Sequence, residues 1–433
     1  MRRALGVALG LACAACALFA PAPDDAARLA EWQRKTVSLR QLQFSRPVQL
    51  HWTTRAEMPE VLREEAAEDL EPARVAQERD GYAALGALAP DVDLAKETLA
   101  LYASQVGGLY SARRSTLFVA DDMSSAMKSV LLDPIVVHEL THALQDQNFP
   151  QILDFVLGLE REDDVARALS GTIEGDASVT MIGALPGASR ANSIAIAEQL
   201  RDALLAELDK PDSDVGRAPR LLSVGLVFPY AFGTVIAARH FEREGNAGLD
   251  AALVDPPLST LQLLRPATRA RIEFVRLGLD SLRASPATAA CAVGEDNVAG
   301  AVVLRVLFEA THKGVALDSL LDGWRGDRYV KLGCGEKWEL VWLTRWSSRE
   351  SAERFAAAYR ALAPGIAARA PLSGPAEVVV RDTSALVVTP GVLTQSDELL
   401  RASEVRSYAD FKAWVADGCF PEKSCPTRDT RAP

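Results

Sequence analysis

Two histidines four residues apart, with a glutamate beside the first, form the motif "HELTH" from His138 to His142. Residues at this spacing lie on one face of a helix, so both imidazoles can point at one ion. Glu139 is rotated by about 100° around the helix. It cannot easily join the two ligands, but it can take a proton from a water held on the ion. The alternative is a solvated or hydrogen-bonded pair of histidines in a polar helix.

Zinc is the metal that this residue set favours, because histidine and carboxylate ligands with one open position are its usual catalytic arrangement. Residue type alone does not exclude manganese or other ions. A third protein ligand is needed. The longer pattern with a third histidine six residues after His142 is absent, because Asn148 stands there. The third ligand is therefore expected to be a carboxylate farther along the chain.

Glu174 is the carboxylate that we predict as this third ligand. From Ala168 to Ala188 the chain is apolar or small, and its only charges are Glu174 and Asp176. A charge in such a helix is costly unless it has a partner or a metal. Asp176 lies two residues further on and points elsewhere, so it is expected to support a ligand rather than to bind the ion. The alternative is that Glu174 is an ordinary helix glutamate.

A helix must carry the two histidines. Asp133 is predicted as its N-cap and Pro134 as its first residue, where the missing N–H of proline costs nothing. Apolar residues recur at helical spacing through the motif, and Pro150 disfavours helix beyond it. Upstream, two short apolar runs separated by polar "SARRS" predict a β-hairpin over residues 108–120.

A second helix, predicted over residues 162–185, carries Glu174. Gly171 and Gly175 are four residues apart, so one face of this helix has little side chain and another helix could pack closely there. Apolar periodicity also predicts helices over 189–210, 225–245, 296–314 and 349–362, and strands over 328–332 and 339–346. The fold class expected from this pattern is α+β and predominantly helical.

The bulk composition is that of a folded globular protein. The chain has 433 residues, of which 48% are hydrophobic and 24% charged. Its net charge of −11 argues against a nucleic-acid binder, which would need a basic face to meet phosphate. A charged, helical segment is expected over residues 23–100. The proline-rich stretch 254–269 predicts a boundary between a domain over 101–270 and a smaller α+β unit over 271–433.

The N-terminus has the pattern of a secretory signal peptide. "MRR" precedes the uncharged apolar run "ALGVALGLACAACALFA", which predicts a signal over residues 1–22 and an exported protein, in the periplasm, the cell envelope or the medium. Small residues precede Cys13 and Cys16, so a lipoprotein signal cut before either cysteine is an alternative, and an uncleaved anchor is another. We expect no second apolar run long enough to span a bilayer.

Four cysteines follow this segment: Cys291, Cys334, Cys419 and Cys425. Their number is even, and export would place them where disulfides form. Cys419 and Cys425 flank the short "FPEKS" and are predicted to close a small loop if the protein is exported. That pair would leave Cys291 with Cys334. Four free thiols are the alternative.

Several of these stretches together resemble a known group. "HELTH", followed thirty-two residues after His142 by "EGDA", resembles the glutamate-zincin metallopeptidases, whose third zinc ligand is a downstream glutamate. "GLYSARRSTLFVADD", "VVHELTHALQDQ", "FPYAFG", "DPPLSTLQLLRP" and "VWLTRW" resemble more closely an uncharacterised family of bacterial exported proteins of this type. The resemblance runs from about Gly107 to about Leu362. In related sequences a histidine is expected near Arg265.

The resemblance implies a zincin-like metallopeptidase domain with a small antiparallel sheet, and a role for each matching residue. His138, His142 and Glu174 would hold one zinc ion, and Glu139 would be the general base. The strand "TLFVA" would be the sheet edge along which a peptide or protein substrate lies.

The oxyanion that forms during peptide hydrolysis also needs a stabilising donor. Such peptidases use a tyrosine or a histidine for this, and Tyr230 and His240 are the candidates. The alternatives are a buried core aromatic for Tyr230 and a surface histidine for His240.

Two functions follow from these expectations. The preferred one is an exported zinc-dependent peptidase. The alternative is a metal-stabilised binding protein with a peptidase-like fold and no turnover, although a purely structural site does not need the base Glu139. Residues 24–100 could also act as a prodomain that covers the site.

Overall fold

The computed structural model describes residues 23–67, 70–105, 107–122, 124–187, 190–268, 270–286, 288–421 and 425–426. The predicted signal segment 1–22 lies outside them. The described chain is α+β and predominantly helical, as predicted.

The helices up to residue 268 are α1 (Pro23–Arg40), α2 (Met58–Glu65), α3 (Pro72–Leu85), α4 (Leu94–Gln105), α5 (Ser125–Asn148), α6 (Pro150–Gly158), α7 (Asp163–Ile182), η1 (Arg190–Asn192), α8 (Ser193–Glu207), α9 (Asp214–Arg217), α10 (Arg220–Phe228), the π-helical turn η2 (Pro229–Gly233), α11 (Thr234–Glu244), α12 (Asn246–Val254), α13 (Thr260–Leu264) and η3 (Pro266–Thr268). The later helices are α14 (Asp280–Ala284), α15 (Gly300–Phe308), α16 (Val315–Gly323), α17 (Arg349–Ala367), η4 (Pro390–Gln395), α18 (Ser396–Ala402) and α19 (Phe411–Ala416). The strands are β1 (Gln49–Thr53), β2 (Gly108–Ser111), β3 (Thr116–Ala120), β4 (Ile272–Arg276), β5 (Ala292–Asn297), β6 (Trp324–Cys334), β7 (Lys337–Trp346), β8 (Glu377–Arg381), β9 (Ser384–Val388) and β10 (Glu404–Tyr408).

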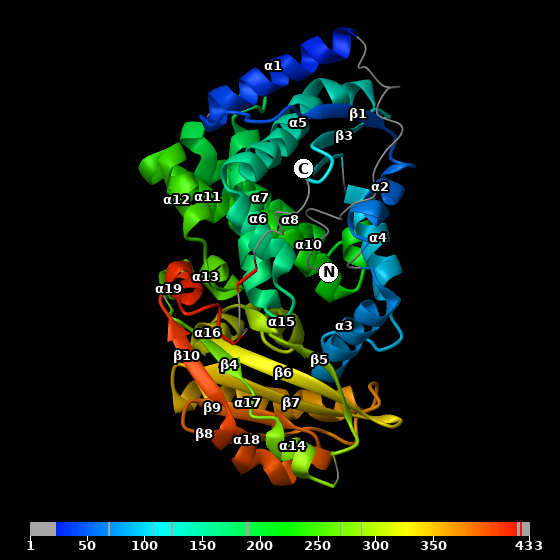
Figure 1. Cartoon of the computed structure of the whole chain (residues 1–433), viewed down its shortest axis with the longest axis vertical. Coiled ribbons are helices and arrows are strands. Elements are labelled where there is room, and N and C mark those ends of the chain that lie inside the picture. The colour runs from blue at the N-terminus through cyan, green and yellow to red at the C-terminus, as the bar shows by residue number, and fades with distance from the viewer. Residues whose placement is uncertain are drawn as a thin grey trace.

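Helices α1, α5, α7, α8, α11 and α12 and a small sheet lie toward one end of the molecule, and a five-stranded antiparallel sheet in the order β5-β6-β7-β9-β8 lies toward the other, together with helices α14, α17 and α18 (Figure 1). The predicted strands at 328–332 and 339–346 lie in β6 and β7. Helix α17 packs on β7, β8 and β9, and α15 lies between β6 and helices α7 and α10. The largest hydrophobic core joins the two ends, because it contains Phe155 and Leu169 as well as Trp342 and Phe355. The predicted domain boundaries stay a prediction.

The predicted start of the histidine helix is wrong. Helix α5 begins at Ser125, and Pro134 lies inside it. Proline has no N–H for the carbonyl of Val130, so one helical hydrogen bond is missing there. Asp133 is not an N-cap. Its carboxylate accepts a hydrogen bond of 2.8 Å from the indole of Trp32, and this contact fastens α1 onto α5. The predicted end is confirmed, since α5 ends directly before Phe149 and Pro150.

The small sheet differs from the expected one in two ways. The hairpin of β2 and β3 is confirmed, but β1 pairs with β3 in parallel, so the sheet is mixed rather than antiparallel. The strand "TLFVA" is β3, and it lies between β1 and β2, so it is not an edge. The reason is a non-local pairing of residues 49–53 with residues 116–120. The edge strand that contacts α5 is β2.

The glycine face predicted on the second helix is confirmed. Helix α7 packs directly against η2 and α11. A Cβ atom at Gly175 would lie 2.4 Å from the carbonyl oxygen of Gly233, and one at Gly233 would meet the backbone of Gly171. The absence of side chains at these three positions lets the two helical stretches approach closely and fixes the position of the neighbouring Glu174.

We expect Gly175→Ala to lower the free energy of unfolding by about 1–3 kcal/mol, because the added methyl group meets backbone that cannot turn aside. The matched control is Gly225→Ala in α10, where a Cβ atom would have nothing within 4 Å. That change should be neutral or stabilising by up to about 1 kcal/mol. Urea unfolding midpoints measure both effects. Equal stability of the two variants would contradict the close packing.

One helical stretch, Arg220–Glu244, is long and apolar enough by length and composition to cross a membrane, and it is the only such stretch in the described part of the chain. The expectation that no second apolar run has the necessary length is therefore wrong. Its most apolar window is 72% buried inside the protein, so packing against α7 and α15 accounts for its composition.

Both predicted disulfides are present. Cys419 is bonded to Cys425, with 5.2 Å between their Cα atoms. Cys291 is bonded to Cys334, which ties the start of β5 to the end of β6. The alternative of four free thiols is wrong.

Candidate metal centre

The side chains of His138, His142 and Glu174 converge on one point, as predicted. His138 Nε2 lies 3.1 Å from Glu174 Oε2 and 3.1 Å from His142 Nε2. His142 Nε2 lies 3.5 Å from the same oxygen of Glu174. Within the described residues these three form the one group of histidine, cysteine and acidic side chains that could hold a metal ion.

The spacing of these three atoms fits a tetrahedral zinc ion. Bonds of about 2.0–2.2 Å at tetrahedral angles separate neighbouring ligand atoms by roughly 3.3–3.6 Å. The observed separations of 3.1, 3.1 and 3.5 Å are close to that value. A second observation points the same way, because Glu174 Oε1 is buried and makes no hydrogen bond of normal geometry. The residues present therefore fit zinc.

Burial and the opposite charges of the three side chains shift the pKa values of Glu174 and His142. Glu174 is fully buried, and burial raises the pKa of its carboxyl, but His142 and His138 outweigh this and lower the pKa to about 2. Burial lowers the pKa of His142, but the charge and hydrogen bonding of Glu174 raise it to about 9. A bound cation would replace the proton that lies between His142 and Glu174, because an imidazole that binds a metal is neutral.

The tautomer of His142 is fixed by Gln145. The amide nitrogen of Gln145 donates to the carbonyl of Ile173 at 3.0 Å and to Asp176 Oδ2 at 2.8 Å. Its oxygen therefore faces His142 Nδ1 at 2.9 Å, and Nδ1 must donate. That leaves the lone pair of Nε2 directed at the other ligands. His138 lacks this support, since its Nδ1 is buried without a hydrogen bond.

Glu139 lies beside the edge strand of the small sheet. Its Oε2 atom accepts a hydrogen bond of 2.9 Å from the backbone N–H of Tyr110 in β2. Gly108, two residues earlier, leaves room for the glutamate, because a Cβ atom there would lie 3.0 Å from Glu139 Cγ. The charge of Glu139 also contributes to the raised pKa of His142. The carboxylate is thus held close to the ligands without being one of them.

Tyr230 is brought to the same place by the π-helical turn η2. Its ring centroid lies 6.2 Å from that of His138. Burial, followed by the charges of Glu174 and Glu139, raises the pKa of Tyr230 well above its usual value. Its hydroxyl therefore stays protonated near neutral pH and can donate a hydrogen bond. A π-helical turn within an α-helix is frequent at functional sites.

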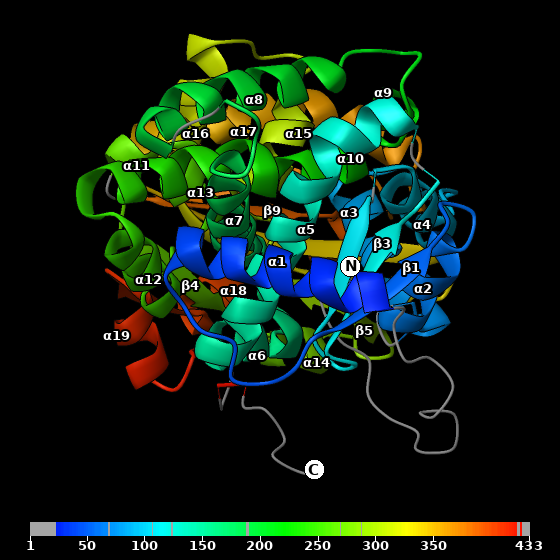
Figure 2. The ribbon, with the colours of Figure 1, turned by 90° about the horizontal axis from the view of Figure 1, so that it is seen from above.

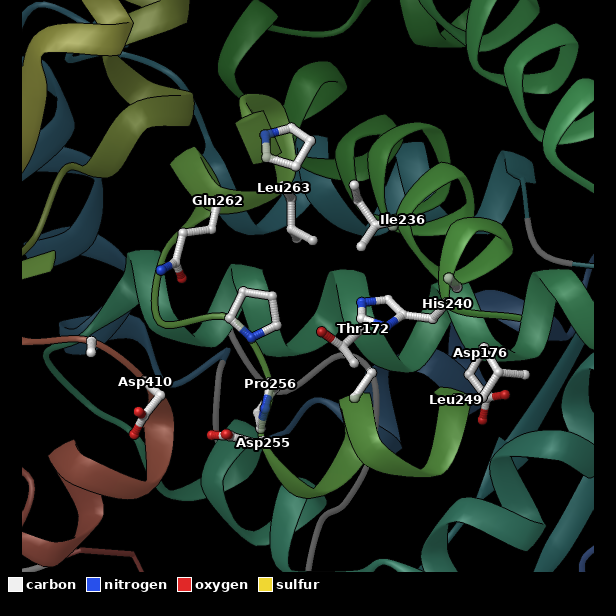
Figure 3. A pocket seen from close by; sticks show the side chains of 16 residues that line it. Thr172, Asp176, Ile236, His240, Leu249, Asp255, Pro256, Gln262, Leu263 and Asp410 are labelled. Atoms are coloured by element: carbon white, nitrogen blue, oxygen red, sulfur yellow. The ribbon is translucent and has the colours of Figure 1, made fainter. Parts of the chain in front are cut away.

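His240 is not brought to this centre. It lines a separate cavity of about 280 Å³, together with Thr172, Leu249 and Asp255 (Figure 3). Its ring contacts the guanidinium of Arg243, and burial lowers its pKa. The position near which a histidine was expected holds Arg265, which forms ion pairs with Asp318 and Asp322.

Sequence reasoning missed three contributors: Gln145, Tyr110 and Arg40. Helical spacing offered a signal for Gln145, which lies three residues after His142 and on the same side of α5. No local signal marked Tyr110, because only its backbone N–H is used. Arg40 reaches Asp176 from 136 residues away in the chain.

A family model described as a domain of unknown function, DUF8575, matches residues 290–397. The match covers about a quarter of the chain and lies outside the residues of the metal centre. No curated protein and no solved structure matches the chain. The zincin-like character of residues 101–270 stays a prediction that depends on the motif residues and their geometry.

Proposed function

We propose that this protein is an exported zinc-dependent peptidase. The observation that carries the proposal is the convergence of His138, His142 and Glu174 at tetrahedral ligand spacing, with the carboxylate of Glu139 beside them. The two disulfides are in keeping with export, since such bonds persist in oxidising compartments.

Each residue has a role in this proposal. Bound zinc would supply a polarised substrate carbonyl and a water whose pKa falls towards about 7. Glu139 would take the proton of that water and pass it to the leaving amine. The Tyr110 N–H would keep the Glu139 carboxylate in position. The edge of β2 that pairs with no other described strand would receive an extended peptide as an additional strand, in place of β3, which is not an edge.

Tyr230 would donate a hydrogen bond from its hydroxyl to the oxyanion that forms when the carbonyl is attacked. We expect Tyr230→Phe to lower kcat by about 10²–10³-fold, the usual effect of losing one oxyanion donor. KM and zinc content should barely change, because the ring remains and the hydroxyl is not a ligand. Steady-state kinetics and metal analysis measure this. Unchanged kcat would assign Tyr230 to packing alone.

The proposed activity is tested with an unbiased peptide library and the metal-loaded protein. We expect one zinc per chain and cleavage that stops when a chelator removes the metal and returns when zinc is restored. A protein that binds one zinc yet cleaves no peptide would contradict the proposal.

That outcome would favour the second candidate, a metal-stabilised binding protein. One observation speaks for it: Glu139 Oε2 is already occupied by the Tyr110 N–H. Such a protein would lose stability on chelation without ever having had turnover.

A further inference from the structure

The polar residues that follow the second histidine in "HALQDQN" all have defined contacts. The last three of these residues contact residues 43–46, which follow α1. Asp146 forms an ion pair with Arg46 at 2.5 Å, and Gln147 accepts hydrogen bonds from the backbone N–H groups of residues 45 and 46. Asn148 donates a hydrogen bond to the carbonyl of residue 43. Gln145 points instead towards α7, where its amide nitrogen donates a hydrogen bond to Asp176. Residues 43–46 are therefore attached along the last turns of α5.

A continuous chain of hydrogen bonds leads from α1 to the metal ligand. Arg40 Nε donates to Asp176 Oδ1 at 2.7 Å, and Gln145 Nε2 donates to Asp176 Oδ2 at 2.8 Å. Gln145 Oε1 then accepts from His142 Nδ1 at 2.9 Å. Arg40, Gln145 and Asp176 are at most 1% exposed, so these hydrogen bonds are shielded from bulk solvent.

The end of α1 that carries Arg40 is anchored on several sides. A second nitrogen of Arg40 lies 2.6 Å from Asp250 of α12. The carbonyl of Leu39 accepts hydrogen bonds from Arg190 and from Asn246. Figure 2 shows α1 lying across α5 and reaching α12 at this end.

We infer that Arg40 is a positioning residue for the metal ligand His142, acting through Asp176 and Gln145, and that the N-terminal segment 23–48 is a permanent part of the site. The inference rests on the proposed metal site. It replaces the expectation that the whole of residues 24–100 could be a removable cover, because removal of α1 would also remove Arg40.

The physical reason is the cost of an unpaired buried charge. Without Arg40, the Asp176 carboxylate is buried with its Oδ1 atom unpaired, which is strongly destabilising, so the carboxylate is expected to move away from its present position. That movement releases the Gln145 amide, and His142 then loses the acceptor that fixes its tautomer. Loss of such an outer partner typically weakens metal binding about 10–100-fold.

The test measures the affinity of the full-length protein for zinc alone, by competition with a chromophoric chelator. Arg40→Met keeps the aliphatic stem and removes the charge, and we expect about 10–100-fold weaker zinc binding. Cobalt(II) in the same site should show a shifted visible spectrum, which a purely structural loss elsewhere would not produce. The Arg40→Met effect should largely disappear in an Asp176→Asn background, because the two residues act in one chain.

The matched control is Asp133→Ala. It removes another contact between α1 and α5, to Trp32 and Lys35, and leaves the chain to His142 intact. It should lower stability and leave the zinc affinity and the cobalt spectrum unchanged. If Arg40→Met does not fold, Arg40→Lys, which retains a charge but not the paired geometry, is measured by the same criteria.

Wild-type zinc affinity in the variant that folds would overturn the inference while leaving the proposed function intact. A wild-type protein that binds neither zinc nor cobalt would overturn the proposed function, and the inference with it. Zinc binding that weakens equally in Asp133→Ala would assign the effect to α1 docking in general and would also overturn the specific role of Arg40.

Discussion

Glu139→Gln is expected to abolish peptide turnover while zinc stays bound. Loss of a general base typically costs about 10²–10⁴ in rate. The glutamine oxygen can still accept the hydrogen bond from the Tyr110 N–H, so the side chain should keep its place. Both imidazoles and Glu174 are unchanged. The measurements are kcat with the best library peptide and the zinc content of the same sample.

The matched control for this variant is Asp133→Asn, which removes a carboxylate from the same helix at an exposed position. It should retain full turnover. A Glu139→Gln protein that cleaves peptides at the wild-type rate would show that the base is a different residue, or that the activity belongs to a contaminant.

Glu174→Ala is expected to lose the metal altogether, and His138→Ala likewise. Each removes one of the three protein ligands, and Glu174 is also the anion that neutralises the centre. The remaining ligand atoms stay buried and lose the partner that was removed, which costs about 1–3 kcal/mol in addition. Zinc analysis after dialysis and thermal unfolding with and without zinc measure the two effects. At a free zinc concentration of 100 times Kd, the wild type should gain about 2.7 kcal/mol.

Ser178→Ala, one turn further along α7, is the control for Glu174→Ala. Its hydroxyl is equally buried and has no hydrogen-bond partner, so its removal should leave both zinc content and stability close to wild type. Full zinc content in Glu174→Ala would remove Glu174 from the ligand set.

The convergence of the three predicted ligands could be anticipated because each signal is local. The spacing of His138 and His142 is set by the helix alone. Glu174 was recognisable as an isolated charge in an apolar helix, and Gly175 beside it indicated the close approach of another helix.

The features that sequence reasoning placed wrongly depend on contacts distant in the chain. Strand β3 became central only because residues 49–53 pair with it across more than sixty positions. Asp133 looked like an N-cap, but Trp32 of a distant helix binds its carboxylate. Arg40 carried no signal, since an arginine in a charged helix is usually solvent-exposed. Only the folded arrangement brings it to Asp176.

The most direct test of the central claim is diffraction from crystals grown with zinc, with data collected on both sides of the zinc absorption edge. We expect one anomalous peak, with bonds of about 2.0–2.2 Å to His138 Nε2, His142 Nε2 and a carboxylate oxygen of Glu174. A peak elsewhere, or a zinc ion on the two histidines with Glu174 at about twice that distance or more, would contradict it.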